Sequence, residues 1–379
     1  MGSKSKLMDF VLSGLNEVRS DELVVDLFSG SGSLAGAIGD QVPIISNDIQ
    51  AYSSVLANCY TQSFQSADAP TVDSLVKNAK EYIYDNFSSL LTFKGYGNDV
   101  SLEEFNIREA DQRRLIDLEY TNEYHLFVKN YSGTWWSADQ CAEIDALKKV
   151  ADDYAGSSVY DAIMSAIMYA MAYASIGTGH YAQYRDAKTL SSMKDIRLYR
   201  NKSLISIFER KYNKILDWLP NRQSDLHHKS LNADYRQVLE SHPNAVVYAD
   251  PPYCFVHYSR FYHALETLVL YDYPDLQVKS DNLVKGRYRD TRHQSPFSIK
   301  SQVNDAFRDL FQGVESFGSK LVLSYSNTGM IDINLLIDLA KETMPTKKIK
   351  LLSTDYKHMT LGRQNDRERD VQECLILCS

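Results

Sequence analysis

The segment DELVVDLFSGSGSLAGAIGD, which spans Asp21–Asp40, decides the fold class of this 379-residue chain. It begins with a short apolar run, continues through a loop of glycine and serine, and ends in an apolar stretch with helical spacing. That order predicts a buried strand, a tight turn and a helix. The next segments, PIISNDI (43–49) and AYSSVLANCYTQSF (51–64), predict a second strand and a second helix. Repeated strand–helix units favour an α/β fold with a parallel sheet covered by helices.

The strand–helix alternation does not continue along the whole chain. Residues 66–229 contain charged, aromatic and alanine/methionine-rich helical stretches without a clear strand between them. Strand-like runs then return at residues 245–249, 320–327, 348–356 and 371–378. We therefore predict a discontinuous α/β domain of residues 1–65 and 230–379, interrupted by a largely helical insertion of residues 66–229.

The composition argues against several classes of protein. The formal net charge of −8 disfavours a protein that coats nucleic acid non-specifically, although it leaves room for a local basic groove. Five scattered cysteines without a CxxC pair, and a His227–His228 pair without neighbouring ligands, predict neither a disulfide framework nor a metal site. The N-terminus has no apolar leader, and the apolar helix at 160–177 carries Asp161. We therefore expect a cytoplasmic protein that does not cross a membrane.

The glycine-rich loop has the features of a ligand-binding turn. Gly30 and Gly32 let the backbone turn tightly and approach a ligand, and the following helix offers free N–H groups. Asp48 ends the second strand, where a carboxylate can accept hydrogen bonds from ribose hydroxyls. The spacing is neither GxGxxG nor a P-loop, so a ligand that contains a nucleoside without a diphosphate fits best. A plain strand–helix turn is the alternative.

The run VVYADPPY, residues 246–253, ends a strand with an acid, two prolines and an aromatic ring. Because proline cannot continue a central strand, the strand should stop at Asp250 and hold this carboxylate at its carboxyl end. Pro251 and Pro252 have restricted φ angles and no N–H, so they can aim a backbone carbonyl rigidly. Taken alone, these residues are also compatible with an exposed turn.

Together and in this order, the elements resemble the Dam-like, alpha-ordered DNA adenine-N6 methyltransferases, which use S-adenosylmethionine. Gly2-Ser3-Lys4 resembles the GxK element that contacts the methionine part of the cofactor, and Asp26–Gly32 resembles the FxGxG motif. Asp48 resembles the ribose-binding acid, and Asp234-Tyr235 resembles the Asp-aromatic pair that holds the cofactor adenine. Asp250–Tyr253 resembles the catalytic DPPY motif. The resemblance covers both pieces of the α/β domain and, only weakly, the insertion.

The resemblance implies a Rossmann-like, S-adenosylmethionine-dependent methyltransferase sheet with the helical insertion as a target-recognition region. It implies cofactor contacts at Lys4, Asp26, Phe28, Gly30, Gly32, Asp48, Asp234, Tyr235 and Asp250. It implies catalytic roles for Asp250, Pro251, Pro252 and Tyr253. Two departures stand out: no aromatic residue precedes the GxK element, and tyrosine replaces phenylalanine in the Asp-aromatic pair.

The chemistry of adenine methylation explains these residue types. The exocyclic N6 is a poor nucleophile because its lone pair is delocalised into the ring. Asp250 and the Pro251 carbonyl can accept its hydrogens and favour a nitrogen geometry suited to attack on a methyl group. Tyr253 can stack against a base that has left the duplex. Neither a metal nor a covalent enzyme intermediate is needed.

Two loops predict contacts to DNA. Residues 278–301 are locally basic and follow the DPPY motif, which suits phosphate contacts beside an extruded base. The candidates in this loop are Lys285, Arg287, Tyr288, Arg289 and Arg292. A second loop, 177–188, offers His180 and Arg185. A solvated surface is the alternative for both loops, and the Trp135–Trp136 pair fits core packing better than contact with a partner.

We therefore predict a site-specific DNA adenine-N6 methyltransferase that extrudes an adenine from double-stranded DNA and methylates it directly. We expect a prokaryotic or phage-encoded protein of a restriction-modification or epigenetic system, with a cognate restriction endonuclease as a candidate partner. A methyltransferase acting on cytosine N4 or on RNA is the second hypothesis. In the family's usage, serine in place of Asp250 would favour cytosine, so the acid favours adenine. A DNA-binding module without catalysis is the third hypothesis.

Overall fold

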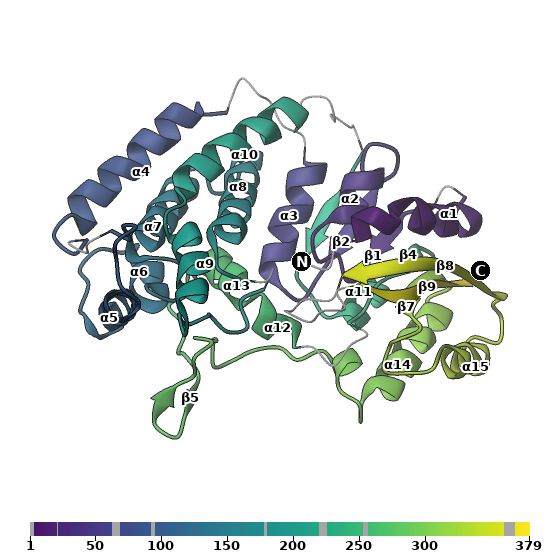
Figure 1. Cartoon of the computed structure of the whole chain (residues 1–379). Coiled ribbons are helices and arrows are strands. Elements are labelled where there is room, and N and C mark those ends of the chain that lie inside the picture. Colours follow the sequence, from purple (N-terminus) through teal and green to yellow (C-terminus); the bar gives the residue numbers. More distant parts are fainter. Residues whose placement is uncertain are drawn as a thin grey trace. The chain divides into compact units, whose positions relative to one another are not determined.

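The chain forms two compact units, shown in Figure 1. Unit 1 comprises Met1–Ser63, Gln223–Ser259 and Arg292–Ser379, and unit 2 comprises Phe64–Arg222 and Arg260–Thr291. This computed structural model describes residues 4–20, 22–62, 69–91, 95–177, 180–219, 226–252, 257–359 and 368–379.

Unit 1 is built around one sheet, to which the described residues contribute seven strands. These are β1 (Val24–Asp26), β2 (Ile44–Asn47), β3 (Lys229–Leu231), β4 (Val246–Ala249), β7 (Lys320–Ser326), β8 (Ile349–Met359) and β9 (Glu368–Cys378). Their order across the sheet is β3-β2-β1-β4-β7-β9-β8. The first five strands in this order are parallel, and β9 runs antiparallel to both of its neighbours.

Helices cover both faces of this sheet. The helices of unit 1 are η1 (Lys4–Leu7), α1 (Met8–Val18), α2 (Ser33–Ile38), α3 (Ala51–Thr61), α11 (Tyr235–Ser241), η5 (Pro296–Ser298), α14 (Val303–Ser316) and α15 (Ile333–Thr343), and α12 (Tyr258–Phe261) lies at the boundary with unit 2. Val24 and Val246 belong to a core with α1, α2 and α3, whereas Val25 and Val247 belong to a core with α11, α14 and α15. Successive side chains of a strand point to opposite faces, so two adjacent apolar residues per strand supply both cores.

The α/β fold with a Rossmann-like sheet that the sequence predicts is confirmed. The predicted strands at 245–249, 320–327, 348–356 and 371–378 correspond to β4, β7, β8 and β9. Sequence analysis missed β3, a three-residue edge strand that pairs with β2 through Ser46 and Ser230. Its sequence KSL is too short and too polar to predict a strand. The segment is extended because its backbone pairs with β2.

Unit 2 is mainly helical. Its elements are α4 (Val72–Phe87), α5 (Leu102–Arg113), η3 (Arg114–Asp117), α6 (Leu126–Tyr131), α7 (Ala138–Asp152), α8 (Ser158–Ala174), α9 (Leu190–Arg200), α10 (Leu204–Trp218), α13 (His263–Leu270) and the two short strands β5 (Val278–Lys279) and β6 (Asn282–Leu283). Five of the helices begin at a hydroxyl side chain that accepts a hydrogen bond from a backbone N–H of the first turn. These caps are Thr71, Ser101, Ser137, Thr189 and Ser203.

The core of unit 2 combines apolar packing with a buried ion pair between Arg200 and Glu109. Trp135 and Trp136 are fully buried, as core packing requires. The Arg200 guanidinium donates to Glu109 through Nε at 3.0 Å and Nη2 at 2.6 Å, which joins α9 to α5. A bidentate arrangement of this kind satisfies both charges away from water.

Residues 260–291 pack within unit 2, although the predicted domain boundaries group them with the α/β domain. The buried Asp145 carboxylate accepts hydrogen bonds from the backbone N–H groups of Phe127 and Val128 and from the Tyr271 hydroxyl at 2.6 Å. The His263 ring contacts the Tyr181 carbonyl at 3.0 Å. The contacts of Asp145 with Tyr271 and of Tyr181 with His263 join positions more than eighty residues apart in the sequence, so local patterns carry no sign of them.

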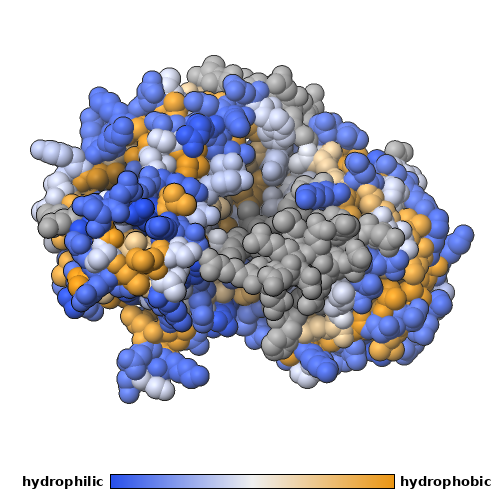
Figure 2. Space-filling model, in the orientation of Figure 1, coloured by the Kyte–Doolittle hydropathy of each residue, from blue (hydrophilic) through white to orange (hydrophobic). Residues whose placement is uncertain are grey.

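The visible surface is mostly hydrophilic, with hydrophobic residues scattered between hydrophilic ones (Figure 2). Among the described residues, no helix combines the length and the apolar character needed to cross a bilayer.

Candidate active site at the carboxyl edge of the sheet

The site of unit 1 begins where three neighbouring parallel strands end. Asp26 is the last residue of β1, Asp48 follows β2, and Asp250 follows β4. Because parallel strands present their carboxyl ends at one edge, the topology gathers three carboxylates that lie far apart in the sequence. This is the edge at which open α/β sheets bind ligands.

The glycine loop between β1 and α2 adopts the backbone conformation that the sequence predicts for a tight turn. Gly30 and Gly32 have φ values of +51° and +69°, in the left-handed region that favours glycine. A Cβ atom on Gly32 would lie 3.0 Å from the Cα atom of Ala57 in α3. The loop therefore excludes a side chain at Gly32 both through its backbone conformation and through its close contact with the next helix.

Asp48 is half-buried and bound to the glycine loop. Its Oδ2 accepts a hydrogen bond from Gly30 N–H at 3.0 Å, and its Oδ1 accepts one from Gln50 N–H at 3.0 Å. Burial raises the pKa of Asp48, while the Gln50 and Gly30 N–H groups act in the opposite direction. Ile49 N–H and the Ser53 hydroxyl also lower this pKa as hydrogen-bond donors, so a ligand hydroxyl would share an oxygen with one of these donors or replace it.

Asn47, which sequence reasoning passed over, fixes the loop and the Asp234 segment to each other. Its Nδ2 donates to the carbonyls of Leu27 and Ala233, each at 3.1 Å, and its Oδ1 accepts from Ala233 N–H at 3.1 Å. The side chain is 1% exposed, so these bonds form away from water. A polar residue at the end of an apolar strand is the sequence signal that marks such a position.

Lys4 lies between two carboxylates at the end of β4. Its Nζ is 3.4 Å from Asp250 Oδ1 and also donates to Glu373 Oε1. Glu373 is 2% exposed, lies in β9 opposite Ser326, and accepts a further hydrogen bond from the Ser324 hydroxyl at 2.9 Å. Burial lowers the pKa of Lys4, but the charges of Asp250 and Glu373 outweigh it, and the net effect is a raised pKa.

The carboxylates of this site differ in how readily they ionise. Burial raises the pKa of Asp250 to about 6, since the lowering effect of Lys4 only partly offsets burial and Glu373 raises it further. Burial, followed by the charge of Asp250, raises the pKa of Asp26 well above its usual range. Asp26 Oδ1 is buried without a hydrogen-bond partner among the described residues. The edge therefore holds a charged lysine, an acid that titrates near pH 6 and an acid that favours its neutral form.

Three aromatic rings lie beside Asp234. Asp234 caps α11 by accepting from Arg236 N–H at 2.9 Å. The Tyr235 ring packs 5.8 Å from Phe28 and 5.4 Å from Phe297, measured between centroids. Tyr235 and Phe297 are buried, whereas Phe28 is half-buried. Phe28 therefore retains ring surface for a ligand, and Tyr235 serves mainly to pack against it.

The DPPY motif lies at the end of β4, in the middle of the sheet. Pro251 is buried and Pro252 is partly exposed. Tyr253 lies outside the described residues, so its predicted stacking role stays a prediction. Sequence analysis identified Asp250 at this position but missed Glu373, which lies 369 positions from its partner Lys4. A lone acid inside the apolar run VQECLILC is the sequence signal for Glu373.

The residues predicted to contact DNA have varied environments in unit 2. Lys285 pairs with Asp186, and Arg289 Nη1 donates to Asp272 Oδ1 at 2.6 Å. Arg185 pairs with Asp195 at 3.4 Å. The His180 ring stacks on Phe261 with centroids 4.3 Å apart, and burial lowers its pKa.

Arg287 and Tyr288 are buried rather than displayed on a loop surface. Arg287 is 7% exposed, and its Nη1 donates to the Asn130 carbonyl at 3.0 Å. Tyr288 is 2% exposed, and its hydroxyl donates to the Ala182 carbonyl. A phosphate contact by either side chain would require it to leave these partners. Arg292 belongs to unit 1 and is partly exposed.

Comparison with known protein families places this site in context. Residues 1–322 match the model of the D12 class N6 adenine-specific DNA methyltransferase family. The chain belongs to this family. The glycine loop, Asp48 and the DPPY motif follow one another along the chain in the order on which the resemblance to adenine-N6 methyltransferases rests, and they lie at the ends of the neighbouring strands β1, β2 and β4.

Relatives of this D12 chain carry names from DNA modification. It is 23% identical to "Modification methylase LlaI" of Lactococcus lactis subsp. lactis, over 99% of this chain and 54% of that protein. It is 22% identical to "Type II methyltransferase M.FokI" of Planomicrobium okeanokoites, over 87% of this chain and 45% of that protein. Identity to "Type II methyltransferase M.NlaIII" of Neisseria lactamica is 22%, over 97% of this chain and 94% of that protein. The chain thus spans about half the length of the first two relatives.

Proposed function

We propose that this chain transfers the methyl group of S-adenosylmethionine to N6 of adenine in double-stranded DNA. The observation that carries the proposal is the position of Asp250. It follows β4, in the middle of a mostly parallel sheet, and is followed directly by two prolines. Membership of the D12 class N6 adenine-specific family supports the choice of adenine as the target.

The neighbouring strand ends fit the cofactor. Asp48, bound to Gly30 N–H at the end of β2, would accept hydrogen bonds from ribose hydroxyls in exchange for, or shared with, one of its present donors. Asp234 and the half-buried ring of Phe28 offer a hydrogen-bond acceptor and a stacking surface for an adenine. The buried Asp26 Oδ1, which has no partner among the described residues, would be satisfied by a donor group of the ligand. When bound, S-adenosylmethionine supplies an electrophilic methyl group.

Asp250 acts as the acceptor for the amino group that is methylated. Its carboxylate would accept a hydrogen bond from N6 and the proton that N6 releases once it has gained the methyl group. The pKa of about 6 leaves this carboxyl ionised at neutral pH and still basic enough to hold the proton briefly. Lys4, 3.4 Å away, favours the ionised form and so keeps the acceptor ready.

Double-stranded DNA is the proposed substrate, and modification is the proposed biological role. The relatives named as modification methylase and type II methyltransferases support an activity paired with a cognate restriction endonuclease. In unit 2, Lys285, Arg289, His180 and Arg185 are the described side chains proposed to contact DNA, together with Arg292 of unit 1. Their present ion pairs with Asp186, Asp272 and Asp195 would exchange for phosphate contacts.

Product analysis tests the proposal. The protein is incubated with duplex DNA of mixed sequence and S-adenosylmethionine labelled on the methyl group, and the DNA is digested to nucleosides. N6-methyladenine nucleoside is the expected product. Methylated cytosine, a product formed on RNA only, or no product at all with every substrate would contradict the proposal. The Asp250→Ala variant should bind DNA as the wild type does and form no product.

A further inference from the structure

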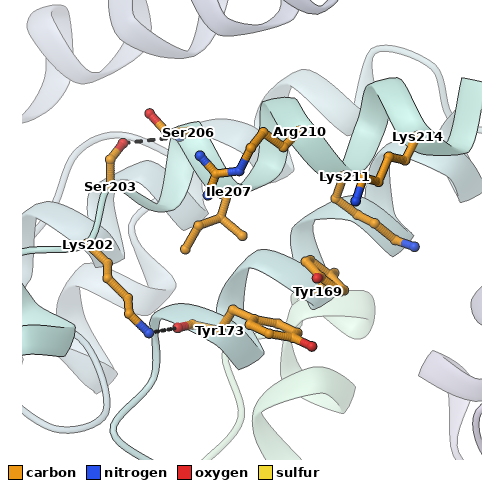
Figure 3. Close-up of a pocket in the computed structure, with 9 residues that line it drawn as sticks. All are labelled: Tyr169, Tyr173, Lys202, Ser203, Ser206, Ile207, Arg210, Lys211 and Lys214. Carbon is orange, nitrogen blue, oxygen red and sulfur yellow. Dashed lines mark hydrogen bonds between the residues drawn. The ribbon is translucent and has the colours of Figure 1, made fainter.

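A pocket of about 370 Å³ lies between α8 and α10 of unit 2 (Figure 3), and none of its lining residues belongs to the site at the carboxyl edge of the sheet. The lining residues are Tyr169, Tyr173, Lys202, Ser203, Ser206, Ile207, Arg210, Lys211 and Lys214. Four of these nine are cations, and none is an acid. The lining is therefore positively charged, although the formal net charge of the whole chain is −8. Charge of one sign concentrated in a hollow attracts ligands of the opposite sign.

Three of the four cations lie on one helix. Arg210, Lys211 and Lys214 project from α10, and no ion pair among the described residues uses them. Lys202 differs, because its Nζ donates to the Tyr173 carbonyl at 2.7 Å (Figure 3). Arg210 and Lys214 are exposed, so both can move toward a ligand without breaking an internal bond.

Two tyrosines form the opposite wall of the pocket. Tyr169 and Tyr173, one helical turn apart on α8, stack with centroids 4.3 Å apart and ring planes 25° apart. They are 36% and 55% exposed, so both rings remain accessible to a ligand. Lys211 Nζ lies 5.1 Å from the Tyr169 centroid, within the range of a cation–π contact. The tyrosine wall therefore holds one cation in place and presents hydroxyl groups beside it.

The start of α10 is not the source of the attraction. Ser203 accepts from Ser206 N–H at 3.1 Å, and Glu143 accepts from Leu204 N–H at 3.1 Å. A helix whose first N–H groups already have partners offers little to an incoming anion. The side chains of Arg210, Lys211 and Lys214 must therefore supply the binding charge.

We propose that the α8–α10 pocket binds the phosphate backbone of DNA outside the methylated base. The proposal rests on the proposed function only in that DNA is the substrate. Exposed, flexible cations and tyrosine hydroxyls suit phosphate oxygens, which require charge and donors but no enclosed pocket for a base. An enclosed nucleotide site would instead bury most of its ligand against apolar walls, and Ile207 is the one aliphatic residue in this lining.

Salt-dependent DNA binding tests this surface. The triple variant Arg210→Gln, Lys211→Gln, Lys214→Gln is compared with wild type for binding to a random-sequence duplex of about 40 base pairs between about 50 and 200 mM salt, without S-adenosylmethionine. The plot of log affinity against log salt has a negative slope, and each lost phosphate contact makes it shallower by about 0.9. The triple variant should therefore have a slope that is shallower by about 2.7. The single variant Lys214→Gln should make the slope shallower by about 0.9, which keeps the test valid if the triple variant unfolds.

A matched control removes the same charge elsewhere on unit 2. Lys77, Arg114 and Lys149 are exposed and already paired with Glu81, Asp111 and Asp153. Their triple change to Gln should leave the slope within about 0.3 of wild type, since no phosphate contact is lost. Equal slopes for the two triple variants would overturn the proposal, as would a loss of binding to free adenosine monophosphate with DNA binding unchanged.

The two proposals fail in different ways. Wild type that forms no methylated adenine would refute the proposed activity, while the salt slope would still report on the pocket. Wild type that methylates adenine, with a pocket variant whose salt slope is unchanged, would refute the pocket alone.

Discussion

Replacing Asp250 by asparagine should stabilise the protein while abolishing its activity. The substitution keeps the size of the side chain and one acceptor oxygen, but it removes the charge and the ability to take a proton. The side chain is 17% exposed, so its ionised form is held mostly out of water. Residues that are needed for the reaction but lower the free energy of unfolding are common in enzyme active sites.

The magnitude follows from the pKa of this carboxyl. It is about 6 in the folded protein against an ordinary value of 3.8. The difference is about 2, and each pKa unit corresponds to about 1.4 kcal/mol, which gives about 3 kcal/mol as an upper limit. The pKa is raised on folding, so the ionised form destabilises the fold above about pH 6 and this penalty fades as the pH falls toward 4. The asparagine variant should therefore gain stability at neutral pH and lose that advantage in acid.

Urea unfolding of wild type and variant at about pH 8 and about pH 4.5 measures this difference directly. Asp338→Asn is the control, because Asp338 is a 74% exposed carboxylate of unit 1 that pairs with Lys341 at 3.9 Å. The control should change stability by less than about 0.5 kcal/mol at either pH. Methyl transfer by Asp250→Asn should fall by about a hundredfold or more. The reasoning would be refuted if Asp250→Asn were no more stable than wild type at about pH 8, or if its extra stability were larger at about pH 4.5 than at about pH 8.

Two further substitutions test parts of the same site. Glu373→Gln keeps the hydrogen bond from Ser324 but removes a charge that raises the pKa of Asp250, so the acid limb of the methyl-transfer rate profile should move to lower pH. An acid limb that stays at the same pH or moves to higher pH would show that Glu373 does not act by raising the pKa of Asp250. Gly32→Ala should lower the free energy of unfolding by about 1–2 kcal/mol because of its left-handed φ and the contact with Ala57. Gly95→Ala, which meets no atom within 4 Å, should have little effect in the same measurement, and equal losses would contradict the strain argument.

Much of the site was predictable from local sequence. A short apolar run, two glycines and a helical stretch define β1, the loop and α2, because each signal depends only on neighbouring residues. The prolines after Asp250 end β4 where the sequence predicts. Asp48 also follows its strand as expected. These features share one cause, since backbone period and proline or glycine conformation are decided within a few residues.

Other parts of the site depended on contacts between distant residues. The sequence around Lys4 does not predict its contact with Glu373. The two side chains meet because β9, which carries Glu373, lies between β7 and β8 in the sheet. The burial of Arg287 and Tyr288 could not be read from a basic loop, since their partners Asn130 and Ala182 come from the helical part of the chain.

The sequence by itself determined the strand ends, the glycine turn, the position of the DPPY motif and the family to which the chain belongs. The tertiary structure alone decided which charges face each other. It placed Lys4 between Asp250 and Glu373, it buried part of the predicted basic loop, and it packed the tyrosines of α8 against the cations of α10. The physical reason is that ionisation and ion pairing depend on distance and burial in space, which chain packing sets and local sequence does not.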